Sequence, residues 1–457
     1  MTWVGIDDTD SPAGGCTTHM LTRLLESAAA REVDLIGYPR LVRLNPNAPG
    51  KTRGNAALSA RFGRGSGRRW LVGRSPAGPV YAFQRGRPLP PRDEEDFLES
   101  AWELVRRESR PEAGTDPALV AHRRRLPASL YWEAVHRQLS LVRVESLLRR
   151  EGARLFTGTS RVGAVGAAAS ISWPGAHPTW ELIAYRPALA QGTRRGPDVR
   201  SLRRLERRYP ELFQCRDERT RRVLVSPHTP CPILYGLRAT DPGRLPHAMA
   251  ELRTESVDRW LVFRTNQGTG DHLRDLPLEE LRPYDAARVS GEVVGPATSV
   301  RGGHWRFVVR QPSGGRTLEC IAFEPTKTLP ALLRTLAAGD RVRLWGGLGA
   351  GASFRVEGVE LLEAVARWQA RSPRRCPSCR KRLRSLGQMR GYRCGGCSAR
   401  YPPELGTNRL AQPAPALGVY HPTPSARRHL APRAPETADG RTPAMRLPRR
   451  SRTDLYA

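Results

Sequence analysis

The stretch Trp3-Val4-Gly5-Ile6-Asp7-Asp8-Thr9-Asp10, followed by Cys16-Thr17-Thr18-His19, decides how this chain begins to fold. A short apolar run ends in three carboxylates, and after a loop of small residues two hydroxyls open an amphipathic segment. This order predicts a β-strand, an acidic loop and a helix over about residues 18–31 that Thr17 or Thr18 caps. Three carboxylates so close together favour a divalent cation that carries a nucleotide phosphate, although a solvated acidic turn is the alternative.

The composition of the 457-residue chain predicts several domains and a polyanionic partner. A net charge of +31 is most simply explained by binding to nucleic acid. A preference for arginine codons explains why only three of the 75 basic residues are lysine, but not the excess of base over acid. No run of 18 apolar residues occurs and the chain enters a strand at once, so we expect a cytoplasmic protein with no membrane span and no signal peptide.

The hydrophobic pattern predicts a multidomain α+β fold. Residues 1–126 indicate an α/β domain, with strands at 40–44, 56–62 and 79–84 and a helix over 94–108 capped by Asp93. Residues 127–270 favour a ferredoxin-like α+β layer in which the arginine-rich stretch 187–210 is solvated. Alternating short runs within 271–366 are typical of a five-stranded OB barrel, with another small β-barrel as the alternative. Residues 404–457 are rich in Pro and Arg and predict an extended tail, anchored around Tyr420 and His429-Leu430.

Four cysteines form the most specific motif. Cys376, Cys379, Cys394 and Cys397 follow the pattern C-x₂-C-x₁₄-C-x₂-C, which is typical of a zinc ribbon over 367–403. Two disulfides are the alternative. Four thiolates leave no open position on the metal, so we expect a structural zinc ion. This segment holds 11 basic residues and no acidic one, which indicates a surface that faces RNA or DNA.

Three polar motifs have weaker signals. Lys51-Thr52-Arg53-Gly54-Asn55 offers two cations and backbone donors to a triphosphate, or is a basic hairpin tip. A polar motif ends a predicted strand at Thr265-Asn266-Gln267-Gly268-Thr269-Gly270. It could contact a base or a small polar ligand, and a simple turn is the alternative. Glu324-Pro325-Thr326-Lys327 has the same ambiguity, but Lys51 and Lys327 stand out as lysines in an arginine-rich chain, because guanidinium replaces a compact ammonium poorly.

Taken in order, these motifs resemble the archaeal tRNA-isoleucine 2-agmatinylcytidine synthetases over residues 3 to about 430. The resemblance rests on the following segments: Gly5–Asp10, Cys16–Thr18, Arg53–Ala56, Glu181–Arg186, Thr265–Thr269, Glu324–Lys327 and the two CxxC pairs. It implies a kinase-like ATP-binding domain over 1–126, a ferredoxin-like domain over 127–270, an OB fold over 271–366, a zinc ribbon over 367–403 and a basic tail over 404–457.

The same resemblance implies an ATP-dependent ligase that modifies an isoleucine tRNA with a CAU anticodon. The C2 oxygen of the wobble cytidine would be phosphorylated and then replaced by agmatine, which gives 2-agmatinylcytidine and reading of AUA. A carbonyl oxygen is a poor leaving group, and phosphorylation makes it a good one, while ATP ends as AMP and phosphate. The implied cofactors are ATP, Mg²⁺ and Zn²⁺, and neither a membrane nor an obligate protein partner is implied.

Roles follow residue by residue from the resemblance. Asp7 and Asp8 would hold Mg²⁺, with Asp10 as third ligand or base. Thr18 stands where the family carries an autophosphorylated threonine, and a helix N-terminus suits that anion, although Thr18 is also read as a simple cap. Lys51, Arg53, Gly54 and Asn55 would bind ATP, and Asn266, Gln267 and Lys327 would contact substrate or tRNA. The chain departs from the family pattern at His19, where an aromatic residue is common, and at Gly270, which separates Asp271 from the motif.

Two other functions fit parts of the sequence. A non-catalytic nucleic-acid-binding protein with an OB fold and a zinc ribbon accounts for the charge and the cysteines, but it leaves the acid triad unexplained. A synthetase of the aminoacylation type, which forms an adenylate on a carboxylic acid, is the weaker alternative.

Overall fold

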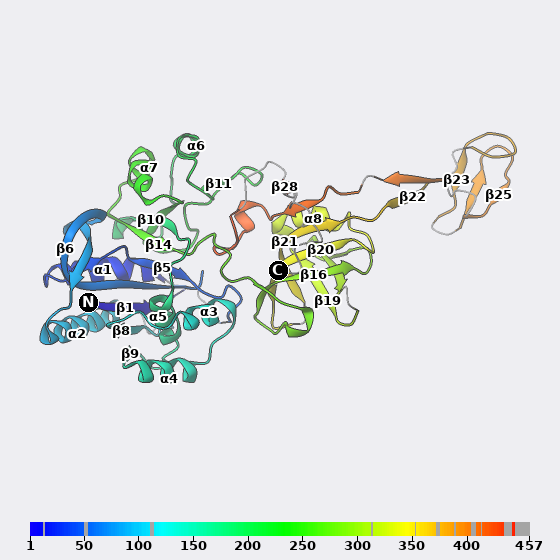
Figure 1. Ribbon diagram of the computed structural model, residues 1–457. Helices are drawn as coiled ribbons and strands as arrows, with labels where there is room; N and C mark the ends of the chain where they lie inside the picture. The colour runs from blue at the N-terminus through cyan, green and yellow to red at the C-terminus, as the bar shows by residue number, and fades with distance from the viewer. Residues whose placement is uncertain are drawn as a thin grey trace, which may run out of the picture.

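A computed structural model describes residues 1–11, 14–49, 54–109, 114–311, 314–351, 353–371, 375–387, 390–403, 408–412, 414–433 and 441–443. Figure 1 shows three bodies in a row: an α/β body built from the N-terminal half, a β-barrel, and a small cysteine-containing module at the end of an arm. In the part of the chain that is described, no helix has both the length and the apolar character needed to cross a membrane.

A ten-stranded sheet forms the centre of the α/β body. Its main path has the order β13-β10-β14-β5-β6-β1-β8-β9, and β4 and β7 pair with β6 and with each other. The strands are β1 (Thr2–Asp7), β4 (Asp34–Ile36), β5 (Arg40–Arg43), β6 (Ala56–Ser75), β7 (Gly78–Arg87), β8 (Ala118–His122), β9 (Arg154–Thr157), β10 (Thr179–Tyr185), β13 (Ile233–Ala239) and β14 (Arg259–Thr265). Because β14 pairs with both β5 and β6, the strands of residues 179–265 continue the sheet of the first 160 residues. The predicted boundary at 126/127 therefore falls inside one sheet.

Helices cover both faces of this sheet. On one face α1 (Thr17–Ala29) and α2 (Pro91–Glu108) bury Val4 and Ile6 of β1. On the other face lie α3 (Ala128–His136), α4 (Leu141–Glu151) and α5 (Gly163–Ser172), while α6 (Val199–Arg208) and α7 (Leu245–Glu251) pack on β10, β13 and β14. Successive residues of β1 point to opposite faces of the sheet, so Val4 and Ile6 face α1 and α2 while Gly5 faces α5. The helix approaches so closely that a Cβ at Gly5 would lie 2.2 Å from the carbonyl oxygen of Ala167.

Three local predictions need correction. The N-cap of α1 is Cys16, so Thr17 and Thr18 are the first two helical residues and neither is the cap. The N-cap of α2 is Pro90, and Asp93 lies in the first turn, where its charge favours the helix dipole. The stretch 187–210 is not simply solvated, because it contains α6, which buries Leu202 and Leu205 against the sheet.

The predicted five-stranded barrel is confirmed. Its strands are β16 (Ala286–Val293), β18 (His304–Arg310), β19 (Thr317–Ala322), β20 (Arg341–Leu348) and β21 (Phe354–Glu363). They close in the order β16-β18-β19-β21-β20, and β20 pairs again with β16. The short helix α8 (Thr328–Leu333) lies between β19 and β20 in the chain and buries Leu329, Leu332 and Leu333 in the barrel core.

A two-stranded arm carries the cysteine module. Strand β22 (Arg367–Arg371) leaves the barrel and pairs with β26 (Asn408–Gln412) on the way back. Between them β23 (Leu383–Ser385), β24 (Tyr392–Cys394) and β25 (Arg400–Tyr401) form a three-stranded sheet, which Figure 1 places at the far end of the molecule from α1.

The tail returns to the other two bodies. Strand β27 (Gly418–Tyr420) pairs with β21 of the barrel and with β28 (Arg441–Pro443). Further on, the carbonyls of His429 and Leu430 accept hydrogen bonds from the amides of Gly268 and Gly270, at 2.8 and 2.9 Å. The anchors predicted around Tyr420 and His429-Leu430 are thus present, and the tail joins the barrel to the α/β body.

Candidate active site

The predicted acid triad gathers where β1 ends. Asp7 is the last residue of β1, and Asp8 adopts a positive φ of 57°, which turns the chain out of the sheet. Burial raises the pKa of Asp7 well above its ordinary range, and burial raises the pKa of Asp8 to about 6. The negative charge of Asp10 adds to both shifts. Carboxylates held in this way gain from a cation, because a cation offsets both the burial and the mutual repulsion.

A fourth carboxylate, Asp116, was not predicted. Strand β8 runs antiparallel to β1 with Asp7 opposite Ala118, so the residues just before β8 lie beside the triad. The amide of Asp116 donates to Asp8 Oδ2 at 3.2 Å. The Asp116 carboxylate accepts bonds from the amides of Thr159 and Ser160, at 2.6 and 2.8 Å, and so shapes the loop that leads into α5. No sequence pattern near Asp116 signals this role, since the strand pairing alone brings it there.

Helix α5 presents its N-terminal end to the triad. A Cβ at Gly166 would lie 1.8 Å from Asp7 Oδ2, and a Cβ at Gly163 would lie 3.1 Å from the Asp8 Cβ. Glycine at 166 therefore permits the close approach of the helix to the carboxylate. The first amides of α5 and their partial positive charge lie near the cluster. Two glycines three residues apart in an alanine-rich helix are the signal that sequence reasoning missed.

The N-terminus of α1 approaches the same place from the other side. Thr17 Oγ1 donates to Asp10 Oδ1 at 3.5 Å, and Thr18 Oγ1 lies 2.9 Å from Cys16 Sγ. Burial raises the pKa of Cys16 to about 11, so its thiol is neutral. The Cys16 thiol thus contacts the Thr18 hydroxyl and forms no side-chain cap on the backbone of α1, so amides at the start of this helix are available to an anion. Two helix N-termini and a carboxylate cluster together suit a phosphate group bound with a divalent cation.

The predicted phosphate-binding loop is only partly described, because Lys51 and Arg53 lie outside the described residues. Asn55 has a positive φ of 44°, and its side-chain amide donates to the carbonyl of Asn45 at 2.8 Å. A Cβ at Gly54 would lie 2.4 Å from Arg43 Nη1, so glycine lets the loop pass over this guanidinium. Arg43, at the end of β5, is thus a largely buried cation beside this loop, and its role was not predicted from the sequence.

Arg43 belongs to a buried polar network with Glu181, Gln267 and His429. Its Nη2 lies 4.0 Å from Glu181 Oε2, and Glu181 Oε1 also accepts from Arg238 Nε at 3.1 Å. The side-chain amide of Gln267 donates to Glu181, and its side-chain oxygen Oε1 lies 3.0 Å from His429 Nδ1. The positive charge of Arg43, followed by burial, holds the pKa of His429 well below its ordinary range. A tail residue thus completes a network that starts in the first 50 residues.

The predicted contact residues Asn266 and Gln267 lie inside the protein. Asn266 is fully buried and donates to the carbonyl of Arg43 at 2.9 Å and to the Tyr131 hydroxyl at 2.7 Å, while its Oδ1 accepts from the Arg43 amide at 2.7 Å. The bonds to Arg43 hold the end of strand β14 against β5. Lys327 lies in the barrel, where it pairs with Glu324. That these three residues contact substrate or tRNA stays a prediction. For Asn266 and Gln267, such a contact requires their buried hydrogen bonds to break.

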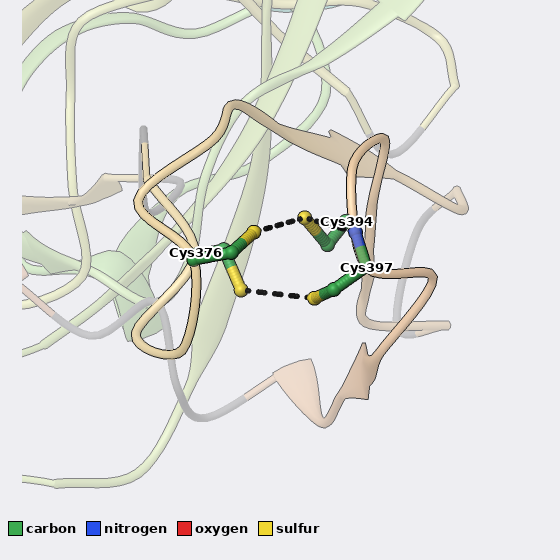
Figure 2. A group of neighbouring side chains, drawn as sticks. Cys376, Cys394 and Cys397 are labelled. Atoms are coloured by element: carbon green, nitrogen blue, oxygen red, sulfur yellow. Dashed lines mark hydrogen bonds between the residues drawn. The ribbon is translucent and has the colours of Figure 1, made fainter.

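The four predicted zinc ligands come together. Their sulfur atoms all lie within 4.8 Å of one another, with Cys376 Sγ 3.6 Å from Cys397 Sγ and Cys379 Sγ 3.3 Å from Cys394 Sγ. Figure 2 shows the loop of Cys376 facing the loop of Cys394 and Cys397. The amides of Cys397 and Gly396 donate to Cys394 Sγ and lower the pKa of that thiol. Tetrahedral thiolates around zinc are about 3.8 Å apart, so the donor set fits this metal.

The fold and the site define a multidomain mixed α/β protein with a carboxylate cluster that suits a phosphate group bound with a divalent cation. A family model described as the TiaS TCKD domain matches residues 3–160, and one described as the TiaS FLD domain matches residues 161–272. The chain is 34% identical over 444 residues to the tRNA-isoleucine 2-agmatinylcytidine synthetase TiaS of Methanopyrus kandleri, covering 94% of this chain and 96% of that protein.

Two solved structures are also similar. A complex of TiaS with its isoleucine tRNA and ATP superimposes with a TM-score of 0.79 and 29% identity, covering 97% of this chain and 99% of the other. A complex of TiaS with the same tRNA, AMPCPP and agmatine superimposes with a TM-score of 0.76 and 27% identity, with the same coverage of both chains. The chain belongs to the TiaS family of tRNA-isoleucine 2-agmatinylcytidine synthetases.

Proposed function

We propose that this protein is an ATP-dependent ligase that attaches agmatine to the wobble cytidine of an isoleucine tRNA. One observation carries the proposal: Asp7 and the half-buried Asp8 lie beside the N-terminal turn of α5, and Asp10 lies beside that of α1, in a chain that aligns over 94% of its length with a relative of this name. Solved relatives hold an isoleucine tRNA with ATP, and the same tRNA with an ATP analogue and agmatine. The net charge of +31 suits a tRNA partner.

The chemistry needs an activated C2 oxygen. Transfer of a phosphoryl group from ATP to this oxygen breaks a P–O bond of the triphosphate, forms a P–O bond to the cytidine and releases the remaining nucleotide. The carbonyl oxygen thereby becomes part of a leaving group. The primary amine of agmatine then attacks C2, the C–O bond breaks, and phosphate leaves with the oxygen, so that one C–N bond replaces one C–O bond. The amine loses its protons in this exchange, and Asp10 is our candidate for the base.

The residues around the acid cluster divide into two roles. Asp7 and Asp8 would hold Mg²⁺, which when bound neutralises charge on the phosphates of ATP. The amides at the start of α1 would bind phosphate oxygens, the positive end of the α5 dipole would add to the attraction, and Lys51, Arg53, Gly54 and Asn55 would bind the rest of the nucleotide. Thr18 would accept a phosphoryl group at the N-terminus of α1, where its hydroxyl lies beside Cys16. These assignments rest on the family motifs and on the burial and charge of the site.

The remaining modules are assigned in the same way. We propose a kinase-like domain over 1–126, a ferredoxin-like domain over 127–270 and an OB fold over 271–366, followed by a zinc ribbon over 367–403 and the tail over 404–457. The closed barrel and the spacing of the four thiols support the third and fourth of these labels. A structural Zn²⁺ in the ribbon would fix its basic surface for RNA. A tRNA substrate favours the cytoplasm as the compartment.

The test is mass spectrometry of tRNA nucleosides after incubation with ATP, Mg²⁺ and agmatine. We expect the wobble cytidine to gain the mass of agmatine less water, and the gain to be lost in Asp8→Asn. A tRNA with adenosine at the wobble position is the matched control, since adenosine has no oxygen at C2. If the natural tRNA stays unchanged while ATP is intact and binding is tight and salt-dependent, the non-catalytic nucleic-acid-binding function replaces this one.

A further inference from the structure

A cavity lies on the same sheet as the acid cluster but away from it. Strand register places Trp180 of β10 beside Arg264 of β14, Arg264 beside Arg40 of β5, and Arg61 of β6 beside Trp3 of β1. These side chains, with Tyr38, line a cavity of about 280 Å³. We call it the arginine–tryptophan pocket. Its volume lies just below the range of about 300–1,000 Å³ for small-ligand pockets, so it has room for no more than one nucleotide.

The pocket concentrates positive charge without a matching acid. None of its lining residues is a carboxylate within the described part of the chain. Burial, followed by the charges of Arg264, Arg125 and Arg61, lowers the pKa of Arg40 to about 9, and burial alone lowers the pKa of Arg61 and of Arg264. Cations that repel one another in a half-buried cavity are stabilised by an anion.

A structural role accounts for only part of this arrangement. Helix α5 ends here, and Arg40 and Arg264 donate to the carbonyls of Trp173 and Gly175, at 2.8 and 2.6 Å. These bonds satisfy carbonyls at the C-terminal end of the helix and just beyond it. A guanidinium has five donors, however, and among the described residues the buried Nε atoms of Arg61 and Arg264 have no hydrogen-bond partner. Capping of α5 therefore leaves donors in the pocket unused.

The aromatic rings add a second kind of recognition. The Arg40 guanidinium lies 4.1 Å from the Trp3 ring centroid, and the Tyr38 and Trp180 rings meet edge to face at 4.6 Å. Aromatic rings beside arginines are the two elements that bind single-stranded nucleic acid, because bases stack on rings and phosphates bind guanidinium groups. A free inorganic anion has no use for the rings.

The pocket and the acid cluster are related through α5. The helix begins at Gly163 beside Asp8 and ends near Arg40, which separates the two sites by about 15 Å along its axis. We propose that the arginine–tryptophan pocket binds a second nucleotide of the RNA, with its phosphate on Arg40, Arg61 and Arg264 and its base against the aromatic rings. The pocket rests on the proposed function, because it positions an RNA strand whose reacting nucleotide lies at the acid cluster.

The test compares two pairs of binding measurements on the full chain with a saturating, non-cleavable ATP analogue present. Arg61→Gln removes a lining charge and leaves the bonds of Arg40 and Arg264 to the end of α5 in place, and Gln84→Trp fills the cavity mouth without a change of charge. Arg68→Gln is the matched control, since Arg68 lies exposed on the same strand and does not line the cavity. Each variant is titrated with isoleucine tRNA at several salt concentrations, and with cytidine and uridine monophosphates by tryptophan fluorescence.

We expect Arg61→Gln and Gln84→Trp to weaken binding of tRNA and of free monophosphates about ten-fold, and Arg68→Gln to leave monophosphate binding unchanged. Equal tRNA affinity in all variants, or equal losses in Arg61→Gln and Arg68→Gln, would overturn the pocket. If the two pocket variants weaken binding of free monophosphates but not of tRNA, the pocket takes free nucleotides and the proposal of an RNA ligand is overturned. If the unaltered chain binds tRNA through Arg61 but never modifies it, the proposed function fails while the pocket stands.

Discussion

Replacement of Gly166 by alanine tests whether Asp7 is held where phosphoryl transfer needs it. The new Cβ would lie 1.8 Å from Asp7 Oδ2, and ordinary contact begins at 3.4 Å, so the carboxylate must move by about 1.6 Å. A misplacement of about 1 Å in an active site costs about 100-fold in rate. We therefore expect Gly166→Ala to lower Mg²⁺-dependent ATP cleavage by at least about 100-fold.

Stability should change far less than activity. Alanine is favoured over glycine inside a helix by about 1 kcal/mol, whereas crowding in a packed interior costs about 1–3 kcal/mol. The free energy of unfolding should thus fall by no more than about 2 kcal/mol, which denaturant titration measures. Gly196→Ala is the control, because no other atom lies within 4 Å of the position that its Cβ would take. A Gly166→Ala protein that cleaves ATP at the normal rate would refute the placement of Asp7.

Three further changes have separate readouts. The pKa of Asp8 is raised from 3.8 to about 6, so the metal-free protein should lose stability as the pH rises from about 4 through about 6. Because Mg²⁺ binds the deprotonated carboxylate, its apparent affinity should fall about ten-fold per pH unit below about 6. Mg²⁺ titrations that are flat from pH 5 to 7 would contradict this. Cys379→Ser should release zinc and weaken tRNA binding while ATP cleavage persists, and loss of cleavage would mean that the ribbon also organises the α/β body. Asn266→Ala leaves buried partners unsatisfied and should cost about 2–4 kcal/mol in denaturant unfolding, whereas unchanged stability with a raised KM for tRNA would favour direct substrate contact.

Prediction succeeded where the relevant signal is local. The apolar run before Asp7 and the helical periodicity after Thr17 correspond to β1 and α1 within one or two residues. The two CxxC pairs also come together as their spacing indicated. Cap identities failed, because Cys16 and Pro90 flank their helices through backbone geometry and not through a capping side chain.

Contacts across the sheet escaped prediction for a physical reason. Asp116 reaches the acid cluster through the pairing of β8 with β1, and His429 reaches Arg43 from the opposite end of the chain. Neither partner has a periodic or compositional signature. The burial of Asn266 escaped for the same reason, since its amide follows strand β14 and bonds to strand β5.

The amino-acid sequence by itself determined that three carboxylates follow the first strand, that four cysteines have metal-ligand spacing, and that the chain is strongly basic. Only the tertiary structure decided that one sheet joins the first two predicted domains, that two helix N-termini face the carboxylates, and that arginines from β5, β6 and β14 share one cavity. Local propensity and spacing act over a few residues, whereas strand register sets which distant side chains become neighbours. Register depends on how both sheet faces are buried, and that is a property of the whole fold.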